Sequence, residues 1–203
     1  MSAFLLAGCA TASGTAAPTA EPTSTAAPSM ITPTPTLTAS PTPTPTEDPA
    51  DPSTWLITEE GIGPITVNAP FSDGVARLPT AVERDPEICR HSVWWKDANG
   101  DQLVVVRDPS TDDAGPLELV FWADWVEPYA VGGPRTAAGI GVGSTVDEVR
   151  AAYPEATETT QQSAPDIHYI VVDSMFFYYR EPSPVISSVW VTNAEQPPYE
   201  ICG

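Results

Sequence analysis

The sequence predicts an α+β domain, made of two tandem helix-plus-antiparallel-sheet halves, behind a disordered N-terminal stalk. Three observations lead to this prediction. A glycine-rich stretch with a helical pattern occurs at 136–154 and, more faintly, at 61–79. Strand patterns follow each copy, and a Thr- and Pro-rich segment precedes both. We place the boundaries at 1–9, 10–53 and 54–203, with the halves at 54–130 and 131–203.

The N-terminal segment contains Leu6-Ala7-Gly8-Cys9, which resembles the lipobox of bacterial lipoproteins. In that family the cysteine becomes the first residue of the mature protein and carries the lipid. The residues before Cys9 include no Lys or Arg, whereas a secretory signal has a positive region and a longer apolar run. We therefore expect a truncated signal whose true start lies upstream of Met1; the alternative is a chance match.

Residues 10–53 are mainly Thr, Pro, Ala and Ser, without Lys or Arg. Such a segment buries too little apolar surface to offset its conformational entropy, which predicts disorder with polyproline II character. At roughly 3.1 Å per residue it extends at most about 130 Å, and its composition is typical of O-glycosylated stalks. A lipid-type cysteine followed by a stalk predicts a protein anchored in the cell membrane and facing the extracytoplasmic side.

Residues 54–203 hold all eight Lys and Arg of the chain, whose formal net charge is −19. Phosphate recognition needs a basic surface, so this charge argues against a nucleic-acid partner. The longest apolar runs, such as Leu103 to Val106, have the length of strands and not of membrane spans.

The stretch at 136–154 predicts a tight glycine-rich turn and then a helix of about three turns. Ile140 and Val142 alternate with glycines and should be buried. Ser144, three residues before Asp147, predicts the helix start. The helix then carries an apolar stripe and ends at a proline; the residues are Val146, Val149, Tyr153 and Pro154.

The fainter copy aligns Gly61-Ile62-Gly63 with Gly139-Ile140-Gly141. Its apolar stripe is Phe71, Val75 and Leu78, and Gly74 lies inside the predicted helix. A duplication explains both copies, and the alternative is two unrelated glycine-rich turns.

Each predicted helix is followed by three predicted strands, at 89–96, 103–107 and 117–125 in the first half and at 167–172, 175–180 and 185–192 in the second. Asp97-Ala-Asn-Gly-Asp101 carries an Asn-Gly hairpin signal. A calcium loop is the alternative there, but the spacing lacks the Gly and Glu of an EF-hand.

These segments resemble the tandem repeat of the β-lactamase-inhibitor-protein-like fold, which also occurs in small outer-membrane assembly lipoproteins. More narrowly, the chain is similar to actinobacterial lipoproteins with a lipobox and a Thr/Pro stalk. The resemblance implies a fold for about residues 57–195. No motif of the inhibitor's binding loops can be placed here, so no inhibitory residue is carried over.

Besides Cys9, the chain contains Cys89 and Cys202. In an oxidising compartment two such residues favour a disulfide, with a free thiol or an intermolecular bond as alternatives. His91 and His168 fall in mid-strand and match no metal spacing. The sequence has no Gly-x-Ser-x-Gly, phosphate-binding loop or His-Glu-x-x-His, so we identify no catalytic residue, metal ligand or cofactor site.

The tryptophans divide between two faces of the predicted strands. Trp95 and Trp125 fall on the more apolar phase, which predicts core positions. Trp94, Trp122 and Trp190 fall on the other phase, beside polar residues, and we predict that they line an open binding face. The alternative is that they pack against the other half or under a loop.

We therefore expect a lipoprotein of the cell envelope that binds a protein or ligand without catalysing a reaction. The alternative is a secreted, wall-associated hydrolase that uses acidic residues, because a pair of carboxylates in a cleft is compatible with so acidic a sequence.

Overall fold

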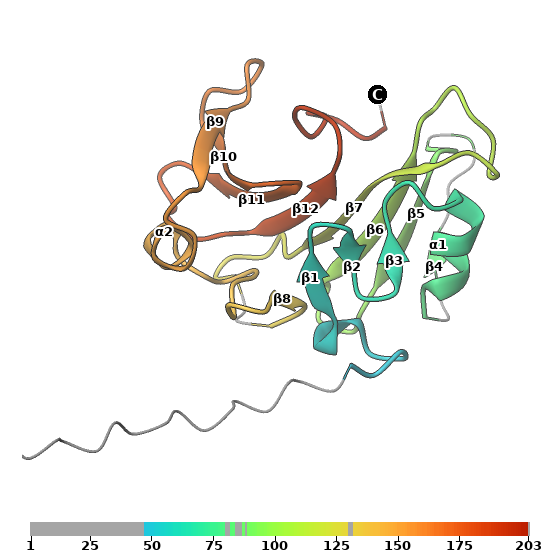
Figure 1. Ribbon diagram of the computed structural model, residues 1–203, viewed down its shortest axis with the longest axis horizontal. Helices are drawn as coiled ribbons and strands as arrows, with labels where there is room; N and C mark the ends of the chain where they lie inside the picture. Colours follow the sequence, from blue (N-terminus) through green and yellow to red (C-terminus); the bar gives the residue numbers. More distant parts are fainter. Residues whose placement is uncertain (1–46, 80–81, 84–86, 88, 130–131, 203) are drawn as a thin grey trace, which may run out of the picture. The chain divides into compact units, whose positions relative to one another are not determined.

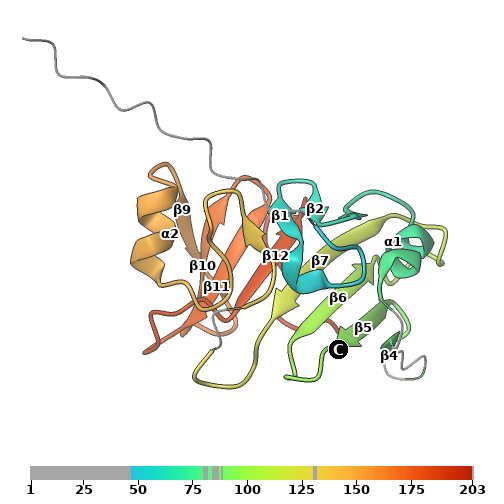
Figure 2. The same ribbon diagram turned by 90° about the horizontal axis from the view of Figure 1, so that it is seen from below.

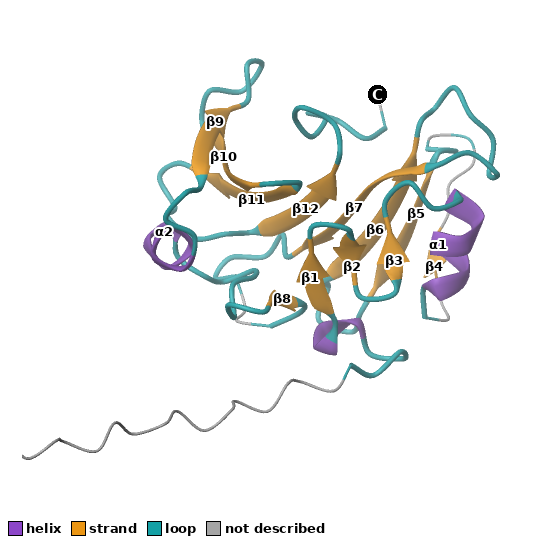
Figure 3. Ribbon diagram, in the orientation of Figure 1, coloured by secondary structure: helices purple, strands orange, loops and turns teal. Residues whose placement is uncertain are grey.

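The computed structural model describes residues 47–203, except 80–81, 84–86, 88, 130–131 and 203. The chain divides into two units, Met1–Thr42 and Pro43–Gly203, and all described residues belong to the second. The described part is a mixed α+β fold with two sheets and two short α-helices (Figures 1 and 3). Cys9 and the predicted stalk up to residue 46 lie outside the described residues.

The larger sheet has eight antiparallel strands in the order β4-β5-β6-β7-β12-β11-β10-β9. Their bounds are β4 (Val82–Glu83), β5 (Ser92–Lys96), β6 (Gln102–Arg107), β7 (Leu117–Ala123), β9 (Thr157–Thr160), β10 (Ile167–Val172), β11 (Met175–Arg180) and β12 (Ser188–Thr192). All six predicted strands are present, and β10 and β11 have the predicted bounds. The predicted 89–96 strand is shorter, so Cys89 and His91 precede β5.

A smaller sheet has the order β3-β2-β1-β8 and was not predicted. It comprises β1 (Leu56–Thr58), β2 (Gly61–Ile62), β3 (Ile65–Thr66) and β8 (Arg135–Thr136), with β1 and β8 parallel. The two glycine-rich stretches therefore lie at this sheet. Ile140 and Val142 are buried as predicted, and Ile62 of the fainter copy is buried as well.

Residues 47–53, assigned above to the stalk, are hydrogen-bonded to the start of the domain. The indole N–H of Trp55 donates to the Asp48 carbonyl at 2.8 Å, and the Leu56 N–H donates to the Glu47 carboxylate at 2.6 Å. Asp51 caps the 3₁₀ turn η1 (Pro52–Thr54). The folded segment thus includes residues before 54.

Both helices are shorter than three turns. The helix α1 (Phe71–Arg77) buries Phe71 and Gly74, and a Cβ on Gly74 would stand 2.5 Å from a Leu117 methyl carbon, so glycine permits close packing on β7. The helix α2 (Val146–Ala152) buries Val146 and Val149.

The start of α2 differs from the prediction by one residue. Thr145, not Ser144, is the N-cap: its side chain accepts the Glu148 N–H, and the Glu148 carboxylate accepts the Thr145 N–H. The Ser144 hydroxyl instead accepts the Gly141 N–H at 3.2 Å, which holds the glycine-rich turn.

The eight-stranded sheet has two different faces (Figures 1 and 2). Both helices and the smaller sheet cover one face, and the segment after β12 crosses the other. The covered face carries one apolar core that includes residues from β1, β6, β11 and β12. A second apolar cluster, formed by alternate residues of β6, β7, β10, β11 and β12, lies on the other face, which we call the open face.

The predicted halves are joined by strand pairing and by packing. Strand β7 pairs with β12 over five residue pairs, from Ser188↔Ala123 to Thr192↔Leu119. The core of the covered face contains residues from both sides of residue 130, among them Val105, Val149 and Phe177. The segments before and after residue 130 therefore share one core and one continuous sheet.

Candidate functional site

The open face carries a row of aromatic side chains that follows the strand register. Trp94 pairs with Val104, Val104 with Phe121, and Phe121 with Trp190, so these four residues point to the same face. The Phe121 and Trp190 rings stack with centroids 4.2 Å apart, and Trp94 meets Phe121 edge-on at 6.0 Å. Trp94 and Trp190 thus lie on the same face of the sheet, where Trp94 is half-buried and Trp190 is only 5% exposed.

Trp122 does not belong to this face, and the prediction that it does was wrong. Its side chain is only 1% exposed and lies in the core of the covered face, 5.9 Å from the Trp95 ring. Cross-strand pairing explains this, because Leu103 pairs with both Trp95 and Trp122. The prediction for Trp125 was also wrong: it follows β7 and is 47% exposed.

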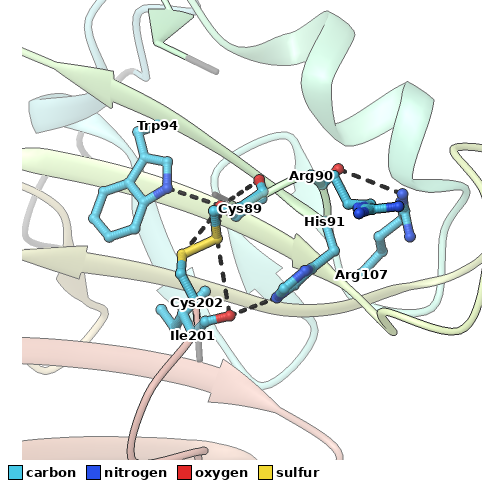
Figure 4. Close-up of a disulfide and its surroundings, with 8 residues drawn as sticks. Cys89, Arg90, His91, Trp94, Arg107, Ile201 and Cys202 are labelled. Atoms are coloured by element: carbon cyan, nitrogen blue, oxygen red, sulfur yellow. Dashed lines mark hydrogen bonds between the residues drawn. A yellow bond between two sulfur atoms is a disulfide. The ribbon is translucent and has the colours of Figure 1, made fainter. Parts of the chain in front are cut away.

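A disulfide joins Cys202 to Cys89, 113 positions earlier (Figure 4). Cys89 lies just before β5, so the bond ties the C-terminal segment to this side of the larger sheet. The Nε2 atom of His91 donates to the Ile201 carbonyl beside this bond. Residues 193–202, which we call the C-terminal strap, therefore lie along the open face, and Ile201 packs against its apolar cluster.

The strap separates two pockets on the open face. One, of about 410 Å³, is lined by the aromatic row and by residues of the strap. The other, of about 340 Å³, is lined by His91, Leu119 and Thr192 among others. Pro198, Glu200 and Ile201 border both pockets. Volumes of this size are typical of small-ligand sites.

The larger of these, which we call the aromatic pocket, presents ring surfaces whose polar atoms already have partners. The Trp94 indole N–H donates to the Ser92 hydroxyl at 2.8 Å, and Figure 4 shows Trp94 beside the disulfide. The Trp190 indole N–H donates to the Ser188 hydroxyl at 2.6 Å. These two donors are therefore occupied within the protein.

Two tyrosines of the aromatic pocket, Tyr169 and Tyr178, are similarly engaged. Burial raises the pKa of Tyr169 to about 12, and its hydroxyl is hydrogen-bonded to Gln161. Burial also raises the pKa of Tyr178, whose hydroxyl is hydrogen-bonded to Arg180. Both phenols are thus neutral near pH 7. At the rim, Arg180 forms an ion pair with Asp166 at 3.3 Å.

The two histidines lie apart from the aromatic pocket. His91 borders the smaller pocket, and His168 lies in β10 as predicted, stacked on Tyr179 with centroids 5.0 Å apart. The His168 ring nitrogens lie 3.7 Å from the carboxylates of Glu158 and Glu181. Within the described ranges, no group of three or more His, Cys, Asp or Glu side chains could hold a metal ion.

The Asp97–Asp101 segment forms the predicted hairpin turn between β5 and β6. The Asp97 carboxylate accepts the N–H groups of Asn99 and Asp101, and Gly100 has φ of 97°. Burial, with the charges of Asp97 and Asp124, raises the pKa of Asp101 to about 6. The Asp97 carboxylate thus stabilises the turn by accepting backbone hydrogen bonds.

Among the residues that the structure describes, no helix has the length and apolar character needed to cross a bilayer. Comparison of the chain with protein-family models, curated proteins and solved structures gives no match.

Proposed function

We propose that this protein is a lipid-anchored module of the cell envelope that binds a protein or ligand on the open face of its larger sheet, without catalysing a reaction. The observation that carries the proposal is the pair of apolar pockets on either side of the disulfide-bonded strap. A strap closed covalently over an aromatic floor gives a fixed pocket wall, which favours binding because little order is lost on association.

The lipid anchor is proposed on Cys9, where Leu6-Ala7-Gly8-Cys9 resembles a lipobox. The Thr- and Pro-rich segment after it would act as a tether. The Cys89–Cys202 disulfide supports an extracytoplasmic location, because disulfides persist mainly in oxidising compartments.

We also propose that the domain is a tandem repeat of the β-lactamase-inhibitor-protein-like type. In support, α1 and α2 each have seven residues, and each precedes four strands of the larger sheet. From the central β7–β12 pair, the strands follow outward as β7-β6-β5-β4 on one side and β12-β11-β10-β9 on the other, so both sides have the same order. The shared core argues that the repeats would fold together and not as independent units.

The alternative, a hydrolase using acidic residues, has one observation in its favour. Asp101 has a pKa raised to about 6 near Asp97 and Asp124, a pattern found in general acids. However, this group stands at the hairpin turn and borders neither of the two pockets beside the strap. Burial of the turn explains its pKa without a catalytic role.

The proposal is tested by capturing partners from envelope extracts. The bait is the full chain carrying Cys9→Ser, so that no lipid is attached, and it is compared with the same bait carrying Tyr199→Ala. Tyr199 lines the aromatic pocket and is 51% exposed, so its removal should leave the fold intact. Val126→Ala, at an exposed residue outside the pocket lining, is the matched control.

We expect a partner that is retained by the Val126→Ala bait and lost with Tyr199→Ala. Equal capture by both baits would contradict a binding role for the open face. Hydrolysis of wall material by the pure protein, abolished in Asp101→Asn, would replace the proposal with the alternative.

A further inference from the structure

From the chemistry of the aromatic pocket we infer that its ligand carries a quaternary ammonium or similar alkylammonium group. This inference rests on the proposed function, because it names the ligand class of that same open face. Three properties lead to it: an aromatic lining with two exposed rings, four hydrogen-bonding groups that already have partners, and an acidic protein around them.

The first property is the aromatic surface. Trp94, which is half-buried, and Trp190, which is buried, belong to the floor on the sheet. Trp125 approaches from the end of β7, and Tyr199 from the strap. Trp125 and Tyr199 are the two large exposed aromatic residues among those described, and both line this pocket. A cation placed over such rings is attracted by their electron-rich faces, and tryptophan gives the strongest attraction.

The second property argues against ligands that need many hydrogen bonds from the sheet side of the pocket. The indole N–H groups of Trp94 and Trp190 donate to serine hydroxyls, and the hydroxyls of Tyr169 and Tyr178 are held by Gln161 and Arg180. A sugar or a peptide backbone needs several hydrogen bonds from its site, and these four groups could supply them only by breaking their present pairs. A tetraalkylammonium group has no hydrogen-bond donor or acceptor and requires none.

The third property is charge. The chain carries 27 Asp and Glu against 8 Lys and Arg, which attracts cations to its surface. Glu200 lines the pocket, and Arg180, the cation at its rim, is paired with Asp166 at 3.3 Å. An anionic ligand would be repelled by this negative charge. Charge and ring chemistry therefore both favour a cationic ligand.

The test compares choline with its neutral isostere 3,3-dimethylbutan-1-ol, which has the same shape without the charge. Isothermal titration and tryptophan fluorescence of the full Cys9→Ser chain measure both affinities. We expect choline to saturate one site and to bind at least about fivefold more tightly than the neutral alcohol. Equal affinities, or no saturation by choline in the folded protein, would overturn the inference.

Variants at Trp125 test whether the rings are responsible. Trp125→Leu keeps an apolar side chain but removes the aromatic face, whereas Trp125→Phe keeps a ring. We expect roughly a threefold to tenfold loss of choline affinity in Trp125→Leu, partial recovery in Trp125→Phe, and no change in Val126→Ala. Equal affinity in the Leu and Phe variants would contradict a cation–π contact.

The same baits separate this inference from the proposed function. If choline fails to bind but an envelope partner is still lost with Tyr199→Ala, the ligand class is wrong and the binding role stands. If choline binds as expected but no partner depends on Tyr199, the pocket chemistry stands and the role as an envelope assembly module falls.

Discussion

The indole of Trp190 stacks on the ring of Phe121, with centroids 4.2 Å and ring planes 12° apart. These residues are also directly paired across β12 and β7, the two central strands of the larger sheet. The pair therefore stabilises the junction between the two segments of the sheet and at the same time forms part of the floor of the aromatic pocket.

Replacing Trp190 with Ala should destabilise the domain strongly. Its buried indole packs on Phe121, so its loss leaves a cavity and costs roughly 3–5 kcal/mol of unfolding free energy. Trp125→Ala, at a half-exposed position, is the comparison and should cost about 1 kcal/mol or less. Denaturant unfolding of both variants measures the difference. Equal losses of unfolding free energy would argue against the packing of Trp190 on Phe121.

Breaking the disulfide should first affect the strap. Cys202→Ser frees a loop of more than 100 residues and lowers the unfolding free energy by at most roughly 4–5 kcal/mol in the chain-entropy description. Because β7 and β12 stay paired over one shared core, we expect a single cooperative transition and no separation of the halves. The aromatic pocket, which loses a wall, should bind its ligand more weakly.

The measurement is denaturant unfolding of wild type and Cys202→Ser, each with and without reductant. Reductant should shift the wild-type transition and leave that of Cys202→Ser unchanged. Two separate transitions in the reduced protein would show that the halves are independent, against the shared core. Ligand affinity unaltered by Cys202→Ser would show that the strap is not a wall of the site.

The strands that could be predicted are those whose signal is local. Ile167 to Val172 and Met175 to Arg180 are apolar runs separated by Asp173-Ser174, and Asp173 adopts φ of 51° in the turn. In contrast, β4 has two residues and β9 is a polar Thr-Glu-Thr-Thr edge strand, so each depends on pairing with its neighbour. The smaller sheet, built from pieces of two or three residues, is equally non-local.

The candidate site was predictable only in part. Two cysteines beyond the lipobox predict the disulfide, but the path of the strap follows no periodic pattern. In β7 both phases contain apolar residues, and Glu118 shares the phase of Trp122, so alternation pointed to the wrong face for Trp122. The face that Trp122 occupies depends on the register of β7 with β6, where a β-bulge shifts the pairing between Val106 and Arg107.

The N-cap of α2 provides a small and specific test of the corrected helix start. Thr145→Ala removes the side chain that accepts the Glu148 N–H and should cost about 1 kcal/mol of unfolding free energy. Asp147→Ala is the control, since that side chain is 95% exposed and contributes only through the helix dipole and an exposed ion pair with Arg150 at 3.9 Å, together by less than about 1 kcal/mol. If the helix began at Ser144, the Asp147 variant would be the more damaging one.

The acidic hairpin turn should make stability depend on pH. The pKa of Asp101 is raised from its ordinary value of 3.8 to about 6, chiefly by burial and then by the charges of Asp97 and Asp124. Between these two values the folded state binds the proton more tightly than the unfolded state. The contribution of Asp101 to stability is therefore most favourable below pH 3.8 and falls as the pH rises towards and through 6.

Replacing Asp101 with Asn should remove this dependence. We expect the variant to be more stable than wild type at pH 7, by no more than about 1 kcal/mol because the partly exposed carboxylate is screened by solvent. The advantage should shrink as the pH falls below about 6 and vanish near 4. Thermal unfolding from pH 4 to 8 measures it, with Asp147→Asn as a control that changes the net charge equally. An Asn variant that is less stable than wild type at pH 7 would mean that the Asp101 carboxylate makes a favourable ionic contact in the turn.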